Sequence, residues 1–180
     1  MNKLPQITLA FWVMKICATT LGETAGALLS MTLNVGYAVS SMLLLSVFVL
    51  TLLTQLFSKT YNPVLYWLVI LSTSTAGTTM SDFMDRTLGL GYASGSLILV
   101  SILVAIFALW KWSGESLNVN NVQTPRGELF YWMAILFSNT LGTALGDYLA
   151  DDSGLGFAGG ALFIGATIGL VVLARYFTKI

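Results

Sequence analysis

Charged residues are scarce in this sequence, and their scarcity is the first constraint on the class of protein. Only 9% of the 180 residues are charged, whereas 56% are hydrophobic. An ordinary soluble domain carries about 25% charged residues, so the polar residues present could not cover a globule in water. Because the apolar residues also come in long blocks, the composition favours a polytopic integral membrane protein.

Histidine is absent and cysteine occurs once, which narrows the chemistry open to the chain. Without histidine there is no Ser-His or Cys-His catalysis, and the commonest metal ligand is missing. Cys17 stands alone in an apolar stretch, so we expect neither a disulfide framework nor a cysteine-rich metal site. The formal net charge is zero, and no basic surface argues for nucleic acid. We therefore expect a protein that is not an enzyme and needs no cofactor.

Six apolar blocks account for nearly the whole chain. They fall at about 7–29, 37–57, 64–84, 92–112, 129–149 and 157–177. Since a transmembrane helix needs roughly 20 residues, the sequence predicts a single all-α transmembrane domain over residues 1–180, with six spans. Most basic residues near the ends of the blocks fall on the side shared by both termini, so the positive-inside rule predicts cytoplasmic termini.

An internal repeat predicts how the six helices are arranged. An aromatic residue and a tryptophan recur three times, followed at fixed spacing by threonine, by glycine and by a Gly-aromatic-Ala triplet. The recurring positions are Trp12, Trp67 and Trp132; Thr20, Thr75 and Thr140; Gly22, Gly77 and Gly142; and Gly36, Gly91 and Gly156. The repeats span about 5–58, 63–113 and 125–180, and each is a helical hairpin. Two spans per unit make the three hairpins parallel, with pseudo-rotational symmetry about the membrane normal.

This pattern resembles a bacterial tandem-repeat membrane protein family known only as domain of unknown function 347. The resemblance rests on Phe11-Trp12, on residues 19–24 and 33–37, on Thr124-Pro125-Arg126, on Tyr131-Trp132 and on residues 141–147. The family usually has four repeats of two transmembrane stretches, whereas three are found here, and its first unit carries an acid at the position of Ala27. The resemblance implies a location in the bacterial inner membrane and no particular activity.

Each odd-numbered block carries a stripe of polar residues that ends in an acid. With 3.6 residues per turn, the members of a stripe share one helix face. They are Thr20 and Glu23 in the first repeat, Thr75, Thr78 and Asp82 in the second, and Thr140, Thr143 and Asp147 in the third, and Asn139 is a further candidate lining residue. A charge at the bilayer centre costs at least about 2.5–3.5 kcal/mol, so we expect the stripes to face one central polar cavity.

The chemistry of these stripes suits hard cations. Carboxylate and hydroxyl oxygens favour Na⁺, Mg²⁺, Mn²⁺ or protons, which makes Glu23, Asp82 and Asp147 candidate metal ligands. In the alternative interpretation, Asp82 and Asp147 are solvated residues at helix ends near the membrane interface. Asp85 and the acids at positions 151 and 152 are expected in a water-exposed loop.

Small residues four apart lie roughly on the opposite side of the same blocks. The packing candidates are Gly22, Gly26, Gly77, Gly142 and Gly146, with Ser81 completing the second pair. Such pairs permit the close approach of helices in lipid. The sequence thus predicts one packing face and one oxygen-bearing face on each odd-numbered helix.

Lys15 interrupts the apolar core of the first block, and both other repeats have isoleucine at the equivalent position. Glu23 lies about 12 Å further along the same helix by its rise, too far for tight pairing. We therefore expect a partner from another helix, with Asp82 and Asp147 as candidates, and a role as counter-ion or gate. In the alternative, the lysine reaches the cytoplasmic interface along its stem, over about two turns if the helix begins near Pro5.

The leading functional hypothesis is a transporter or channel-like protein for a small solute or cation, either a divalent metal ion, Na⁺ or a proton-coupled solute. The alternative is a non-transporting interaction or assembly module that packs through its glycine faces. Expected partners are the lipid bilayer, a small cation and further copies of the chain. An intramembrane enzyme is disfavoured, because only an aspartyl pair such as Asp82 with Asp147 could act and no protease motif accompanies it.

Overall fold

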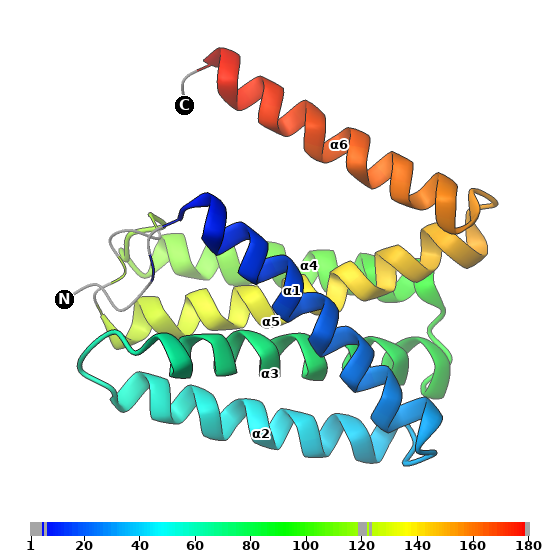
Figure 1. Cartoon of the computed structure of the whole chain (residues 1–180), viewed down its shortest axis with the longest axis horizontal. Coiled ribbons are helices and arrows are strands. Elements are labelled where there is room, and N and C mark those ends of the chain that lie inside the picture. Colours follow the sequence, from blue (N-terminus) through cyan, green and yellow to red (C-terminus); the bar gives the residue numbers. More distant parts are fainter. Residues whose placement is uncertain (1–4, 6, 119–121, 123, 179–180) are drawn as a thin grey trace.

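The computed structural model describes residues 5, 7–118, 122 and 124–178, and the elements of this part of the chain are all helical (Figure 1). The helices are α1 (Leu9–Ala27), α2 (Tyr37–Phe57), α3 (Pro63–Asp82), α4 (Tyr92–Trp112), α5 (Pro125–Asp147) and α6 (Gly156–Thr178). The prediction of an all-α protein is confirmed, and each helix begins and ends within a few residues of its predicted block.

Capping side chains set the starts of the odd-numbered helices. Thr8, Asn62 and Thr124 each accept hydrogen bonds from backbone N–H groups of the first turn. Helices α3 and α5 also carry proline in that turn, where the missing N–H has no partner to lose. Helix α1 has no such proline and begins at Leu9 rather than near Pro5, because the capping hydroxyl stands directly before Leu9.

Each odd-numbered helix ends in a five-residue π-helical turn, which repeats the sequence pattern in the backbone. These turns are η1 (Leu28–Thr32), η2 (Phe83–Thr87) and η4 (Tyr148–Asp152). Two residues with positive φ follow each turn, namely Asn34 and Gly36, Gly89 and Gly91, and Gly154 and Gly156. Glycine and asparagine tolerate this left-handed backbone best. The glycine of the Gly-aromatic-Ala triplet therefore has a steric role in reversing the chain.

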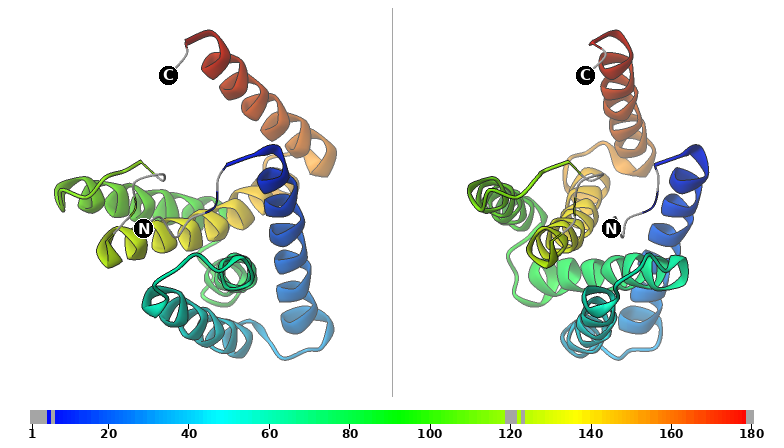
Figure 2. Two further views of the ribbon diagram at one scale, coloured as in Figure 1. Left: turned by 60° about the vertical axis from the view of Figure 1, so that its left-hand side comes forward. Right: turned by 90° about the vertical axis from the view of Figure 1, so that its left-hand side faces the viewer.

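Helix α3 lies at the centre of the bundle. It packs against α1, α2 and α5, and α4 packs against α5 (Figures 1 and 2). The starts of the odd-numbered helices lie at one end of the bundle, and the π-helical turns lie at the other (Figure 1). Equivalent residues of the three repeats therefore lie at similar heights along the bundle.

Helix α6 departs from this arrangement. It packs mainly on η4 and points away from the other helices (Figure 1). Its large apolar side chains are exposed, with Leu162 at 75% and Leu170 at 67% of their accessible area. Within the described residues, α6 is thus an apolar helix without an extended contact to another helix.

Buried side chains join the three repeats at the end where the odd-numbered helices begin. The hydroxyl groups of the repeat-equivalent residues Tyr66 and Tyr131 lie 2.8 Å apart. Trp132 is fully buried and its ring centre is 5.3 Å from that of Tyr66. The amide of Gln55 in α2 donates a hydrogen bond of 3.0 Å to the carboxylate of Glu128 in α5. These contacts hold α2, α3 and α5 in register.

Four helices are long and apolar enough to cross a membrane: α2, α4, α5 together with η4, and α6. Their number and length favour an integral membrane protein. Helices α1 and α3 are interrupted by the polar stripes and do not reach the same hydropathy. The buried hydroxyl groups of α3 show that its polar residues face other helices.

Glycine permits the close approach of the odd-numbered helices. A Cβ atom at Gly22 would lie 2.5 Å from that of Ser74, and one at Gly77 would lie 3.0 Å from the backbone nitrogen of Thr140. A Cβ atom at Gly26 would lie equally close to the backbone of α3. The glycine face of α1 therefore packs on the polar stripe of α3, and that of α3 packs on the polar stripe of α5.

Replacing Gly22 by alanine should destabilise the protein, because the added methyl group meets α3 where no space exists. Overpacking of this kind costs about 1–3 kcal/mol. Gly169 is the matched control, since a Cβ atom there has no neighbour within 4 Å and alanine is the better helix former. Thermal unfolding in detergent should rank Gly22→Ala below the unmodified chain and Gly169→Ala at or above it. Equal unfolding temperatures for the two variants would contradict the packing described here.

Candidate functional site

A groove between α1 and α5, with α3 as its floor, holds several of the predicted site residues. Its first part is a cavity of about 250 Å³ with mostly aromatic and apolar walls, lined also by Lys15 and the two hydrogen-bonded tyrosines. Its second part is a cavity of about 240 Å³ lined by Thr19, Glu23, Ser74, Thr78, Ser138, Asn139, Gly142 and Thr143. Ser138 and Asn139 line both cavities, so the two adjoin at these residues.

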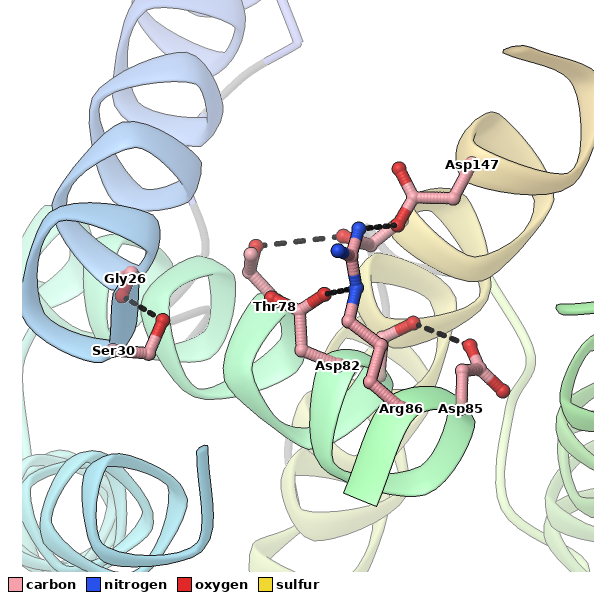
Figure 3. Close-up of polar contacts among 9 residues, drawn as sticks. Gly26, Ser30, Thr78, Asp82, Asp85, Arg86 and Asp147 are labelled. Carbon is pink, nitrogen blue, oxygen red and sulfur yellow. Dashed lines mark hydrogen bonds and ion pairs between the residues drawn. The ribbon is translucent and has the colours of Figure 1, made fainter. Parts of the chain in front are cut away.

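The polar part of the groove is cross-linked by side-chain hydrogen bonds. Asn139 donates from its amide nitrogen to the hydroxyl of Thr73 at 3.1 Å. The hydroxyl groups of Thr78 and Thr143 lie 3.4 Å apart (Figure 3). The hydroxyl of Ser74 donates to the backbone carbonyl of Thr19 in α1 at 2.8 Å. Oxygen atoms from three odd-numbered helices therefore meet in this part of the groove, over somewhat more than one helical turn.

The remaining predicted hydroxyl residues lie outside the groove. Thr75 and Thr140 are buried in helix contacts and donate to carbonyl groups of their own helices at 3.0 Å. Thr20 is exposed and lines neither cavity. The reason is geometric: the glycine face of one helix covers part of the polar stripe of the next, so the stripes do not all open into one cavity.

An arginine connects two of the predicted acids at the far end of the groove (Figure 3). Nε of Arg86 lies 3.0 Å from Oδ1 of Asp82, and Nη2 lies 3.5 Å from Oδ2 of Asp147. The Asp82 side chain is only 2% exposed, whereas that of Arg86 is 37% exposed. Glu23 is close enough to Asp147 for their charges to interact. Two acids thus share one cation from η2, and Glu23 lies in the adjoining cavity.

Arg86 is not among the residues predicted from the sequence. Its distance of four residues from Asp82 is the signal that identifies the pair, because residues four apart lie on one helix face. The two tyrosines are marked only by the aromatic–tryptophan pairs of the repeat. Those pairs indicate where the two tyrosines lie in the repeat, but they do not predict the hydrogen bond between the hydroxyl groups.

Lys15 pairs with neither Asp82 nor Asp147, contrary to the expectation from the sequence. Both acids are bound by Arg86, and no ion pair joins Lys15 to a carboxylate of the described residues. Because α1 begins at Leu9, Lys15 belongs to its second turn, about 12 Å along the helix from the acidic end. It is half-buried in the wall of the first cavity.

Asp85 also differs from its expected place in a wet loop. It is 5% exposed, and the hydroxyl of Ser81 donates to its Oδ2 at 3.2 Å (Figure 3). The π-helical turn directs its Oδ1 toward Gly95, where a Cβ atom would overlap the carboxylate. Within the described residues, Oδ1 has no hydrogen-bond partner. Asp151 and Asp152 are exposed, as expected, but they lie in the π-helical turn η4 rather than in a loop.

No three acidic or cysteine side chains of the described residues are grouped so that they could hold a metal ion. Asp82 and Asp147 face an arginine, and Glu23 lies in the adjoining cavity. A metal ion shared by these three acids stays a prediction. The groove can instead offer single carboxylate, amide and hydroxyl oxygens to a cation that keeps part of its water shell.

The model of a family described as "Repeat of Unknown Function (DUF347)" matches residues 10–61, 65–116 and 130–180. The chain therefore belongs to this family of tandem repeats and carries three of them. Each matched segment coincides with one hairpin, α1–α2, α3–α4 and α5–α6. No curated protein and no solved structure matches the chain.

Replacing Arg86 by methionine should destabilise the protein, because it leaves the buried carboxylate of Asp82 without its partner. Removing one partner of a buried ion pair costs up to about 3–5 kcal/mol, and we expect a smaller loss because Arg86 is partly exposed. Adding Asp82→Asn should restore much of the stability, since the uncompensated charge is then gone. Thermal unfolding of the two single variants and the double variant measures this coupling. Additive effects would show that the bridge contributes nothing.

Proposed function

We propose that this member of the repeat family is a six-span membrane protein that conducts a small cation along the groove between α1 and α5. Four helices meet the length and hydropathy of a span. Helices α1 and α3, with 19 and 20 residues, have nearly the length that a membrane span needs. Helix α3 is enclosed by α1, α2 and α5, which permits its polar residues within a bilayer. The starts of the odd-numbered helices then face the cytoplasm of a bacterial inner membrane.

The observation that carries the proposal is that the two cavities of the groove adjoin at Ser138 and Asn139. One cavity extends toward Lys15 and the other toward the acidic end. Hydroxyl, amide and carboxylate oxygens can replace part of the water shell of a cation. Glu23 is the carboxylate that lines this path directly, and Thr78 and Thr143 supply neutral oxygens beside it.

The two ends of the groove have opposite roles in this proposal. At the acidic end, Asp82, Asp147 and Glu23 outnumber Arg86, so the end attracts cations. Arg86 occupies both aspartates, and its displacement by an entering cation opens the path. At the other end Lys15 provides a positive charge that opposes free passage. Exchange of charge partners at Arg86 would gate the groove.

Uptake of Na⁺ and of Mn²⁺ into proteoliposomes tests this function. The unmodified chain should carry at least one of the two ions, and Glu23→Gln should reduce that flux at least about tenfold, the effect of losing one ionic contact of about 1.4 kcal/mol. Replacing both Asp82 and Asp147 by asparagine should abolish it. Asp151→Asn is the control, because this acid is exposed in η4 and should leave flux unchanged.

Two results would oppose the proposal in different ways. If neither ion moves through the unmodified chain, the cation-conducting function is wrong for these ions. If flux persists at its full rate in Asp82→Asn/Asp147→Asn, the acids at the end of the groove are not part of the path.

The second candidate function is a membrane assembly module without transport. It is favoured by an uncovered surface on α5, where Cβ atoms at Gly142 and Gly146 would meet no described atom within 4 Å. At the equivalent positions of α1 the neighbouring helix is in contact. Stable association of copies together with the absence of any cation flux would favour this function over the first.

A further inference from the structure

The internal repeat gives a packing rule for the even-numbered helices. Helix α2 of the first repeat packs on α3 of the second, and α4 of the second packs on α5 of the third. In the first case the hydroxyl groups of Thr51 and Ser72 lie 3.0 Å apart. In the second case the rings of Trp110 and Phe130 are stacked with centres 6.1 Å apart. Each even-numbered helix thus packs on the odd-numbered helix of the following repeat.

Helix α6 has the matching face but no following helix among the described residues. Ile168 of α6 is 58% exposed, whereas its equivalent in α2, Phe48, is 2% exposed. Ile164 is 38% exposed, whereas its equivalent in α4, Leu99, is completely buried. The other equivalents, Leu103 and Leu44, are half-buried, so these positions are covered wholly or in part in the first two repeats and more open in the third.

Among the described residues, no even-numbered helix of a preceding repeat covers the corresponding face of α1. Met14 is 47% exposed and Leu21 is 59% exposed, whereas their equivalents in α3 are Val69 and Ala76, both completely buried. An apolar groove of about 650 Å³ lies here between α1 and α3. Its lining includes Met14, Ala18, Leu21, Trp67, Leu68 and Leu71.

The equivalent groove one repeat further along is filled, and its occupant identifies what the open groove fits. Between α3 and α5 lies α2, whose Gln55 is hydrogen-bonded to Glu128 of α5. Trp132 on the wall of this filled groove is completely buried, whereas its equivalent on the open groove, Trp67, is only partly covered. The open groove therefore has the shape and the apolar lining that accommodate an even-numbered helix of this same repeat.

We propose that α6 of one copy docks into the groove between α1 and α3 of a second copy. The second copy then continues the repeat array. Its α1 packs against α5 and α6 of the first copy, in the same way that α3 packs against α1 and α2 within one chain. The uncovered Gly146 of α5 faces that same incoming helix, since the equivalent Gly26 of α1 contacts α3. The contact between two copies thus covers three surfaces that are open among the described residues of one chain: the face of α6, the groove between α1 and α3, and the glycine surface of α5.

The membrane makes this association compatible with the parallel topology. Two copies related by a rotation about the membrane normal keep the same orientation, so α6 enters the groove in the direction that α2 takes in its own. Lipid acyl chains compete for the same apolar surfaces, and helix association in lipid depends on close packing rather than on water exclusion. The proposed contact does not depend on cation conduction and can hold where that function fails.

A disulfide cross-link tests the contact with one substitution. Transferring the contact of Thr51 with Ser72 by two repeats places Val171 of α6 next to the native Cys17 of the second copy. Two hydroxyl groups in contact mark a separation that a disulfide can span. Val171 is 64% exposed, so Val171→Cys leaves the fold of each chain intact. Mild oxidation of native membranes that contain this variant should produce dimers or longer ladders on non-reducing gels.

Three variants serve as controls. Leu170→Cys places the thiol on the outer face of α6, since the equivalent Leu50 of α2 is 65% exposed, and should cross-link several-fold less. Cys17→Ser with Val171→Cys should not produce the same linked species. Thr51→Cys with Ser72→Cys, in a chain with Cys17→Ser, should form an internal link that blocks labelling by a thiol-reactive polymer, which shows that the oxidant reaches this depth.

The outcomes separate the possible occupants of the groove. Linked dimers or ladders formed by Val171→Cys well above the Leu170→Cys level support docking between copies. Monomers alone, with the internal control linked, overturn the proposal and leave lipid as the occupant of the groove. A link within one chain, seen as a monomer with blocked thiols, overturns it as well. Co-purification of two differently tagged, unmodified chains gives the same answer without any substitution.

Discussion

The central constraint in this structure is the meeting of a glycine face with a hydroxyl-bearing face between successive odd-numbered helices. Gly22 lies against Ser74 of α3, and Gly77 lies against Asn139 and Thr140 of α5. A larger residue at either glycine would push these helices apart. Because the helices approach closely, hydroxyl groups that hydrocarbon would not tolerate are satisfied by neighbouring carbonyls and side chains.

This packing also determines where polar groups remain accessible. Since the glycine faces cover Thr75 and Thr140, only the edges of the polar stripes open into the groove between α1 and α5. There Glu23 stands beside neutral oxygens, and the two aspartates are held by Arg86. The arrangement combines a rigid wall with an ionic contact that can exchange partners, which is the combination that a gated cation path requires.

The sequence predicts the fold well because the pattern that carries it is repeated three times. The hairpins, the packing at Gly22, Gly26 and Gly77 and the start of α3 follow from residues whose role is local. The predicted packing glycines Gly142 and Gly146 meet no described atom within 4 Å of an added Cβ. The start of α1 is missed because Thr8, three residues beyond Pro5, caps the helix. The binding of Arg86 to an aspartate of another repeat and the burial of Asp85 depend on how η2 turns, which no local pattern specifies.

The central claim is that the groove between α1 and α5 holds water and gives ions a path. Cysteine accessibility tests it directly, with Ser138→Cys and Thr143→Cys in the groove and Val104→Cys on an exposed apolar face of α4, each in a chain with Cys17→Ser. In intact membranes, a charged thiol reagent should modify the first two positions and not the third. Unreactive thiols at both groove positions would contradict the account and mean that the groove is closed to water.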